Sequence, residues 1–422
     1  MGVVADLVKD VSLPKVFRAK QIFDAGKIDD VEAAVIEQLS RPEIKNTIQR
    51  GTSVCLTCTS RGVDNLALVL KLTADFCKRQ GASPFIVPAM GSHGGATAEG
   101  QSAVASGYGV TEEYCGCRII SCMDTVEIGK TPDGIDVYID KYAAKADGVI
   151  VINRIKPHTD FTGPYESGIM KMMAIGLGKQ YGASLCHAAG FGAMAKMVPA
   201  FGQVVLDKAN ILFGLGLVEN AYDKTWKVKA LTPKEIPELE PKLLDEARDR
   251  MPRILFDTAD VLVVDKIGKN ISGDGMDPNI TGRFTAPYKT GGINAQRVVV
   301  LDVTEESHGN ILGAGLADFG TMRIFKKFDF EKTYPNCITS RVPLGGFLPL
   351  IMQSDRLAIQ GAVRTCVGID EAKIRLIRIK NTLSMDEIEL SEAYYQEAKK
   401  NPSLTIVSDL YALPFDGEGN LL

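Results

Sequence analysis

The sequence is poor in histidine and tryptophan and contains no long apolar run. Only four histidines and one tryptophan occur in 422 residues, so a very small set of side chains would have to carry any imidazole chemistry. No apolar run reaches the roughly 18 residues that a membrane-spanning helix needs. Lys and Arg total 48 against 52 Asp and Glu, a net charge of -4. This balance favours neither a nucleic-acid-binding surface nor a polybasic membrane patch.

The first residues lack the features of a targeting segment. Residues 1–17 contain no basic stretch before their apolar part, which is interrupted by Asp6 and Asp10. We therefore do not expect a signal peptide. The sequence begins Met-Gly but has no Ser or Thr at position 6, so the myristoylation pattern fails. We expect a cytoplasmic enzyme or binding protein.

Nine cysteines are too few, and odd in number, for a disulfide framework in a chain of this length. Two groups invite a zinc or iron–sulfur hypothesis: Cys55 with Cys58, and Cys115 and Cys117 with Cys122. The first pair lies in a strand-like stretch, where residues three apart point to opposite faces. This favours buried small side chains over a metal site, although a non-catalytic metal-binding or ligand-binding protein stays among the alternatives.

The first half alternates apolar strand-like stretches with amphipathic ones, the pattern of α/β units around a mainly parallel sheet. Beyond residue 220 a second α/β segment begins, and we place the domains at 1–240 and 241–422, with a tail that could pack back on the first domain. The expected strands are 53–59, 84–88, 148–153, 226–230, 261–265 and 298–302, and the expected helices are 64–80, 233–250, a stretch near 310–325, and 385–399.

The loops after the first three predicted strands carry reactive side chains. Ser60 and Arg61 follow the first strand, His93 the second, and Lys156 and His158 the third. In open α/β sheets ligands bind outside the carboxyl ends of the strands. Placement alone therefore indicates a functional site at this edge.

Lys171 stands among methionines and an isoleucine, and His158 and His187 flank it in the sequence. Partial desolvation lowers the pKa of a lysine and makes it a usable nucleophile. Taken alone, it could equally be a surface lysine with a buried stem, and each histidine could be structural. With His93 in a glycine-rich loop, however, the set indicates an assembled site.

The ordered set resembles the nickel-dependent lactate racemase family, over essentially the whole chain. The motifs that carry the resemblance are Gly91-Ser92-His93 with Thr97 and Glu99, the His158 segment, Ser167-Gly168 before Lys171, His187, Gly275-Met276-Asp277-Pro278-Asn279-Ile280, and Ser307-His308-Gly309.

The resemblance implies two α/β domains with mainly parallel sheets and an active site in the cleft between them. It also implies a racemase or epimerase of a 2-hydroxy acid that works by reversible hydride transfer to a nickel-pincer nucleotide, Ni(II) with pyridinium-3-thioamide-5-thiocarboxylic acid mononucleotide. Lys171 would be the thioamide tether, with Lys179 as the alternative, and His187 would ligate the nickel. Neutral imidazole suits square-planar Ni(II). His93 and His158 would be the acid–base pair.

The resemblance also suggests roles for surrounding residues. Ser60, Gly94 and Thr97 would contact the nucleotide, and Arg61 would bind its phosphate or the substrate carboxylate. The substrate-facing segment reads Thr281-Gly282-Arg283-Phe284 in place of the lactate enzymes' glutamine and lysine, so we expect Asn279 and Arg283 to contact a substrate other than lactate. We expect a structural role for His308.

The expected partners are a small-molecule 2-hydroxy acid and the proteins that make the cofactor, with no nucleic acid and no membrane. The sequence leaves the oligomeric state open. An alternative function is a nickel-independent two-base or NAD-linked hydroxy-acid enzyme. Its weakness is that Gly176-Leu177-Gly178 lacks the third glycine of a dinucleotide-binding loop.

Overall fold

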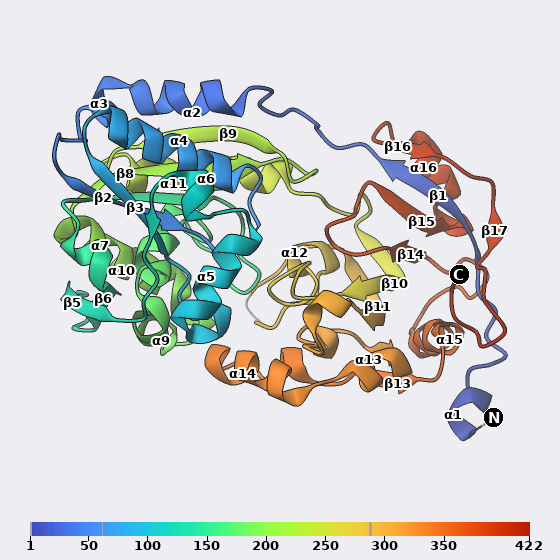
Figure 1. The fold of residues 1–422 in the computed structure, drawn as a ribbon. Helices are drawn as coiled ribbons and strands as arrows, with labels where there is room; N and C mark the ends of the chain where they lie inside the picture. The colour runs from blue at the N-terminus through green and yellow to red at the C-terminus, as the bar shows by residue number, and fades with distance from the viewer. Residues whose placement is uncertain (1, 61, 287–288) are drawn as a thin grey trace. The chain divides into compact units, whose positions relative to one another are not determined.

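The computed structural model describes residues 2–60, 62–286 and 289–422 (Figure 1). They form two compact units, residues 24–251, here called the N-terminal unit, and residues up to 23 together with 252–422, here called the C-terminal unit. The division differs from the predicted boundary at residue 240, which falls inside helix α11 (Ile236–Arg250). Residues up to 23 join the C-terminal unit because strand β1 (Lys15–Gln21) pairs with three of its strands.

The N-terminal unit is built on a six-stranded sheet in the order β4-β3-β2-β7-β8-β9. All neighbours pair in parallel except β9, which is antiparallel to β8, so the predicted mainly parallel sheet is confirmed. The strands are β2 (Ser53–Cys58), β3 (Ser83–Pro88), β4 (Arg118–Ile119), β7 (Gly148–Arg154), β8 (Ile211–Glu219) and β9 (Thr225–Leu231), with a separate β5 (Thr125–Lys130) and β6 (Asp136–Asp140) pair.

Both faces of this sheet are covered by helices, which explains the continuous apolar runs of its strands. In β7, Val149 and Val151 enter one core, whereas Ile150 and Ile152 enter the other. The helices are α2 (Val31–Ser40), α3 (Pro42–Lys45), α4 (Leu66–Arg79), α5 (Ala98–Gly107), α6 (Glu112–Cys115), α7 (Lys141–Lys145), α8 (Ile169–Lys171), α9 (Lys179–His187), α10 (Met194–Lys208) and α11, with a π-helical segment η2 (Met172–Gly176) after α8.

The C-terminal unit has a mixed sheet in the order β13-β12-β11-β10-β14-β15-β1-β16, with β17 paired to β1. Its first five strands run in parallel, and the rest pair antiparallel. The strands other than β1 are β10 (Thr258–Ile267), β11 (Asn294–Val303), β12 (Phe319–Thr321), β13 (Leu350–Met352), β14 (Leu376–Ile379), β15 (Glu387–Ser391), β16 (Leu404–Ile406) and β17 (Tyr411–Ala412); the helices are α1 (Val3–Asp6), α12 (Pro278–Thr281), α13 (Met322–Lys327), α14 (Phe330–Ser340), α15 (Asp355–Thr365) and α16 (Tyr395–Lys400).

Two predicted helices of this unit are wrong. The stretch near 310–325 contains β12, which pairs with β11 and β13 before α13 begins. The stretch 385–399 contains β15, where Ile388 and Leu390 are buried and alternate with partly exposed glutamates. This period of two is the pattern of a strand; a short 3-10 turn, Glu392–Tyr394, follows, and the α-helix begins at Tyr395.

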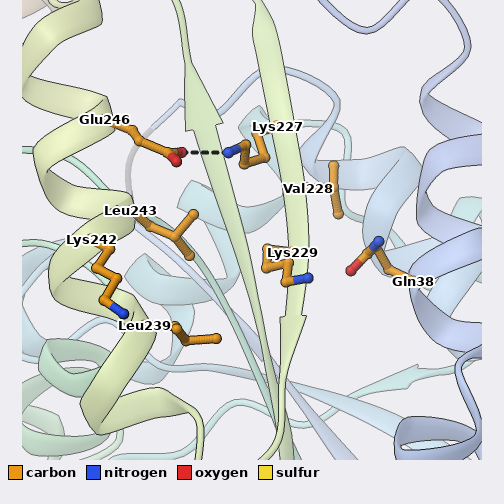
Figure 2. Close-up of a pocket in the computed structure, with 8 residues that line it drawn as sticks. All are labelled: Gln38, Lys227, Val228, Lys229, Leu239, Lys242, Leu243 and Glu246. Carbon is orange, nitrogen blue, oxygen red and sulfur yellow. Dashed lines mark hydrogen bonds and ion pairs between the residues drawn. The ribbon is translucent and has the colours of Figure 1, made fainter.

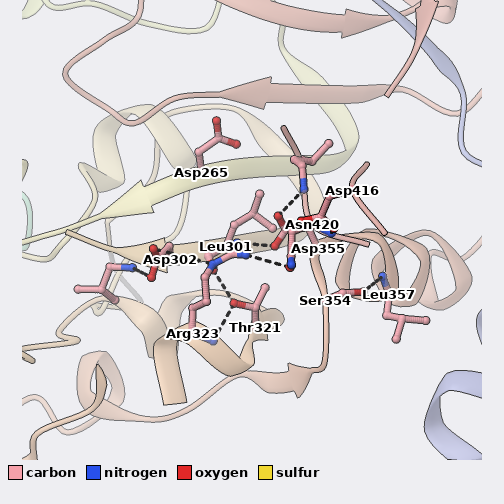
Figure 3. Close-up of polar contacts among 12 residues, drawn as sticks. Asp265, Leu301, Asp302, Thr321, Arg323, Ser354, Asp355, Leu357, Asp416 and Asn420 are labelled. Atoms are coloured by element: carbon pink, nitrogen blue, oxygen red, sulfur yellow. Dashed lines mark hydrogen bonds and ion pairs between the residues drawn. The ribbon is translucent and has the colours of Figure 1, made fainter. Parts of the chain in front are cut away.

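The end of the chain is anchored within the C-terminal unit. Arg323 donates to the Asn420 side chain at 3.0 Å (Figure 3). The Leu421 N–H donates to Asp355 at 2.9 Å. Asp416 accepts the Asn420 N–H at 2.8 Å. Among the described residues, no single helix has the length and apolarity of a membrane span. Helix α9 and the stretch Phe191–Lys208 have that length and apolarity only when taken together, and the pair is bent by 85° at its break.

Candidate functional site

The N-terminal sheet has its topological switch point between β2 and β7. From β2 the chain continues to β3 and β4 on one side, and it later returns to place β7 on the other side of β2. Loops at the carboxyl ends of two such strands diverge and leave room for a ligand. Ser60 follows β2 and His158 follows β7, so the sheet topology places the two predicted segments on either side of the switch point.

His93 lies in the loop after β3 and reaches the loop after β2. Its Nδ1 forms a hydrogen bond with the Ser60 hydroxyl, which can donate or accept and therefore suits either tautomer of the neutral ring. Gly94 has φ +66°, and a Cβ there would lie 2.6 Å from the Gln101 nitrogen. Only glycine fits this turn. Thr97 caps α5 by accepting the Gly100 N–H at 3.0 Å.

Lys179, the alternative tether, is a buried structural residue. Its side chain is 0% exposed, its ammonium lies 3.1 Å from the Asp140 carboxylate, and it also donates to the Pro88 carbonyl. It further donates to the Gln101 side-chain oxygen at 3.2 Å. The Gln101 side-chain nitrogen in turn donates to the Gly91 carbonyl at 2.9 Å. Lys179 thus supports the loop that carries His93, and its ammonium has no exposure to a ligand.

His158 is presented by a loop that closes on itself. Lys156 and Ser167 exchange two backbone hydrogen bonds at the base of the loop, at 2.9 and 3.0 Å. The His158 Nδ1 accepts the Asp160 N–H at 3.0 Å, and the Asp160 carboxylate lies 3.7 Å from the same nitrogen. Because Nδ1 accepts this N–H, the ring carries its proton on Nε2.

Lys171, His158 and His187 converge on two phenylalanines. The Phe161 ring lies 4.5 Å from the His158 ring and 5.9 Å from the Lys171 ammonium. The Phe191 ring lies 6.0 Å from the His158 ring and 5.8 Å from the His187 ring. Lys171 is the last residue of α8, directly before the π-helical segment, a distortion that is frequent at functional sites.

The electrostatics of His187 favour a neutral imidazole. Burial, together with the neighbouring Lys171 ammonium, lowers the pKa of His187 to about 4. The ring is therefore uncharged at neutral pH, the state in which imidazole ligates a metal.

Three of the predicted site residues are not among the described residues of the N-terminal unit. Arg61 lies outside the described residues. Asn279 belongs to the C-terminal unit, where its backbone and side-chain nitrogens both donate to Asp277 at 2.9 Å. Arg283 of the same unit pairs with Asp318 at 2.7 Å and donates to a backbone carbonyl at the start of β11. These partners give its guanidinium a structural use.

A groove of about 400 Å³ lies away from the switch point, on edge strand β9 between α2 and α11 (Figure 2). An ion pair of 2.6 Å joins Lys227 and Glu246 along it, and no predicted site residue lines it. The lining residues are Gln38, Lys227, Val228, Lys229, Leu239, Lys242, Leu243 and Glu246.

Six of the nine cysteines are buried, and Cys117, Cys122 and Cys366 are partly exposed. Cys55 and Cys58 enter different cores on opposite faces of the sheet, which confirms the predicted orientation. Burial raises the pKa of the Cys58 thiol to about 12 and that of Cys117 to about 11, so these thiols stay protonated at neutral pH. Within the described ranges, no group of His, Cys, Asp and Glu side chains is arranged to hold a metal ion.

Sequence reasoning missed the residues that hold these segments in place. Glu166 and Glu240 are both buried carboxylates, the first in the His158 loop and the second on α11, which contacts the segment before Lys171. A glutamate in a polar loop, or in a charged helix, carries no sequence signal of burial.

Comparison with known proteins agrees with this architecture. Residues 7–195 match the family model described as the lactate racemase N-terminal domain. Among solved structures, the chain is similar to the lactate racemase apoprotein from Thermoanaerobacterium thermosaccharolyticum, at 14% identity and a TM-score of 0.52, covering 88% of this chain and 99% of that one. It is also similar to a Thermotoga maritima protein solved by structural genomics, at 13% identity and a TM-score of 0.54, covering 85% and 99%. No curated protein sequence matches the chain.

These findings confirm the resemblance over the matched region, and at such identities the structural likeness shows the fold. The chain therefore has the α/β fold of lactate racemase, and its residues 7–195 match the lactate racemase N-terminal domain family.

Proposed function

We propose that the chain is a racemase or epimerase of a 2-hydroxy acid that holds a nickel-pincer nucleotide through Lys171 and His187. The observation that carries this proposal is the convergence of Lys171, His158 and His187 on Phe161 and Phe191. The match of residues 7–195 to the lactate racemase N-terminal domain family supports it.

The donor set fits the cofactor. His187 offers a neutral imidazole, which is a good ligand for Ni(II), and Lys171 offers a partly exposed amine beside it. The other lysine of this segment, Lys179, forms a buried ion pair with Asp140, so we choose Lys171 as the tether. When bound, the group would supply a reversible hydride acceptor for C2 of the substrate.

His93 and His158 would move the proton of the substrate hydroxyl. A racemase meets both enantiomers and therefore needs an acid–base group on each side of the carbon. The His93 ring is oriented by the Ser60 hydroxyl and the His158 ring by the Asp160 backbone. General acid–base catalysis of this kind contributes about 10²–10⁴ in rate.

Incubation of the cofactor-loaded protein with enantiopure 2-hydroxy acids in deuterium oxide tests this function. We expect racemisation with the original hydrogen kept at C2, and loss of activity in His93→Ala and His158→Ala. Incorporation of deuterium at C2 would indicate a two-base proton mechanism instead. The substrate, the cofactor-synthesis partners and the cytoplasmic location stay predictions.

A further inference from the structure

An ion pair from helix α11 closes the loop that carries His158. Glu166 has a side chain that is only 1% exposed, and its carboxylate lies 2.6 Å from the guanidinium of Arg248 on α11. The same guanidinium nitrogen donates to the Gly163 carbonyl at 3.1 Å. Arg248 therefore contacts the loop at two points, one charged and one neutral.

The carboxylate of Glu166 binds the loop backbone from inside. It accepts the His158 N–H at 2.6 Å and the Gly163 N–H at 3.1 Å. Hydrogen bonds to an ionised acceptor are shorter and stronger than neutral ones. Removing Arg248 would leave this buried carboxylate without its countercharge, which low-dielectric surroundings tolerate poorly.

These contacts fix His158 at its backbone, while the Asp160 N–H fixes its ring at Nδ1. A side chain held in this way loses little entropy when it reaches a reactive geometry. We propose that Glu166 and Arg248 are positioning residues that hold His158 for proton transfer, an inference that rests on the proposed function. Neither residue needs to touch the substrate.

The contacts that Glu166 and Arg248 make with the loop are here called the clamp. The clamp could serve the fold alone, or it could also position His158. The two roles can be told apart by following single histidines, because the chain has only four. Their Cε1–H groups give four cross-peaks in a proton–carbon spectrum of histidine-labelled protein, without any cofactor. The test variants are Glu166→Gln and Arg248→Met, with Arg248→Lys as the conservative rescue. Glu238→Gln, an exposed position on the same helix, is the matched control.

We expect both test variants to shift the His158 cross-peak, to leave the His308 cross-peak in place, and to speed amide exchange of residues 157–167 by about tenfold or more. Arg248→Lys should bring the His158 cross-peak and the amide exchange of residues 157–167 most of the way back to their wild-type values. In the loaded enzyme we expect kcat to fall by about 10–100-fold with a nearly unchanged KM. Glu238→Gln should match the wild type in every measurement.

An unmoved His158 cross-peak and unchanged exchange in the two test variants would overturn the clamp. A moved cross-peak with wild-type kcat would overturn the positioning role. Failure of the wild-type loaded chain to racemise any 2-hydroxy acid would instead refute the proposed function, and with it the proton-transfer role, whatever the spectra of the variants show.

Discussion

Replacement of Glu240 by Gln should change how the stability of the protein depends on pH. Glu240 lies on α11 with 1% of its surface exposed, and its carboxyl oxygens accept the Met170 N–H at 3.0 and 3.2 Å, one residue before Lys171. Burial raises the pKa of Glu240 from its ordinary 4.5 to about 8, against the opposing effect of the Met170 and Ile169 N–H groups.

The sign follows from proton binding. Between the two pKa values the folded chain keeps a proton at Glu240 that the unfolded chain has released, so stability falls as the pH rises from about 4.5 to about 8 and is then constant. Each pKa unit corresponds to about 1.4 kcal/mol, which makes the loss between pH 5 and pH 8 on the order of 4 kcal/mol as an upper bound. Glutamine is neutral and similar in size to the protonated acid, so Glu240→Gln removes this dependence.

Urea unfolding followed by circular dichroism at several pH values measures the effect. We expect Glu240→Gln and the wild type to have similar stability near pH 5, and the variant to become the more stable protein, by up to about 4 kcal/mol, near pH 9. Glu238→Gln, on the exposed side of α11, should follow the wild-type curve. Parallel curves for Glu240→Gln and the wild type would refute the reasoning.

Two further changes test how the site is supported. A Cβ at Gly168 would lie 2.1 Å from the Glu240 carboxyl group, so Gly168→Ala should lower the unfolding free energy by about 1–3 kcal/mol in urea titration. A Cβ at Gly107 would meet no atom within 4 Å, so Gly107→Ala should not lower the unfolding free energy. Lys179→Met leaves Asp140 as a buried unpaired carboxylate and should cost about 3–5 kcal/mol in the same titration; a wild-type midpoint would contradict the ion pair's structural role.

The strands around the site could be predicted because their sequences are continuous apolar runs, which belong to sheets buried on both faces. The predicted 53–59 and 84–88 correspond to β2 and β3 within one residue at each end. The strand-end positions of Ser60, His93 and His158 follow from the same pattern.

The supporting residues could not be predicted, because burial of a charged side chain depends on partners that are distant in sequence. Lys171 and Lys179 stand in similar apolar surroundings in the sequence, yet Lys179 is fully buried against the carboxylate of Asp140, which comes from β6. Arg248 reads as part of a solvated charged helix, and its role depends on Glu166, which lies 82 residues earlier in the chain.

The central claim is that Lys171 carries the cofactor, and mass spectrometry tests it most directly. The protein is produced together with the cofactor-synthesis proteins, weighed intact and mapped by peptides, and its nickel content is measured. We predict about one nickel per chain and a covalent mass increment on the peptide that contains Lys171, both lost in Lys171→Ala. A chain of unmodified mass without nickel, or an increment that survives in Lys171→Ala, would contradict the account.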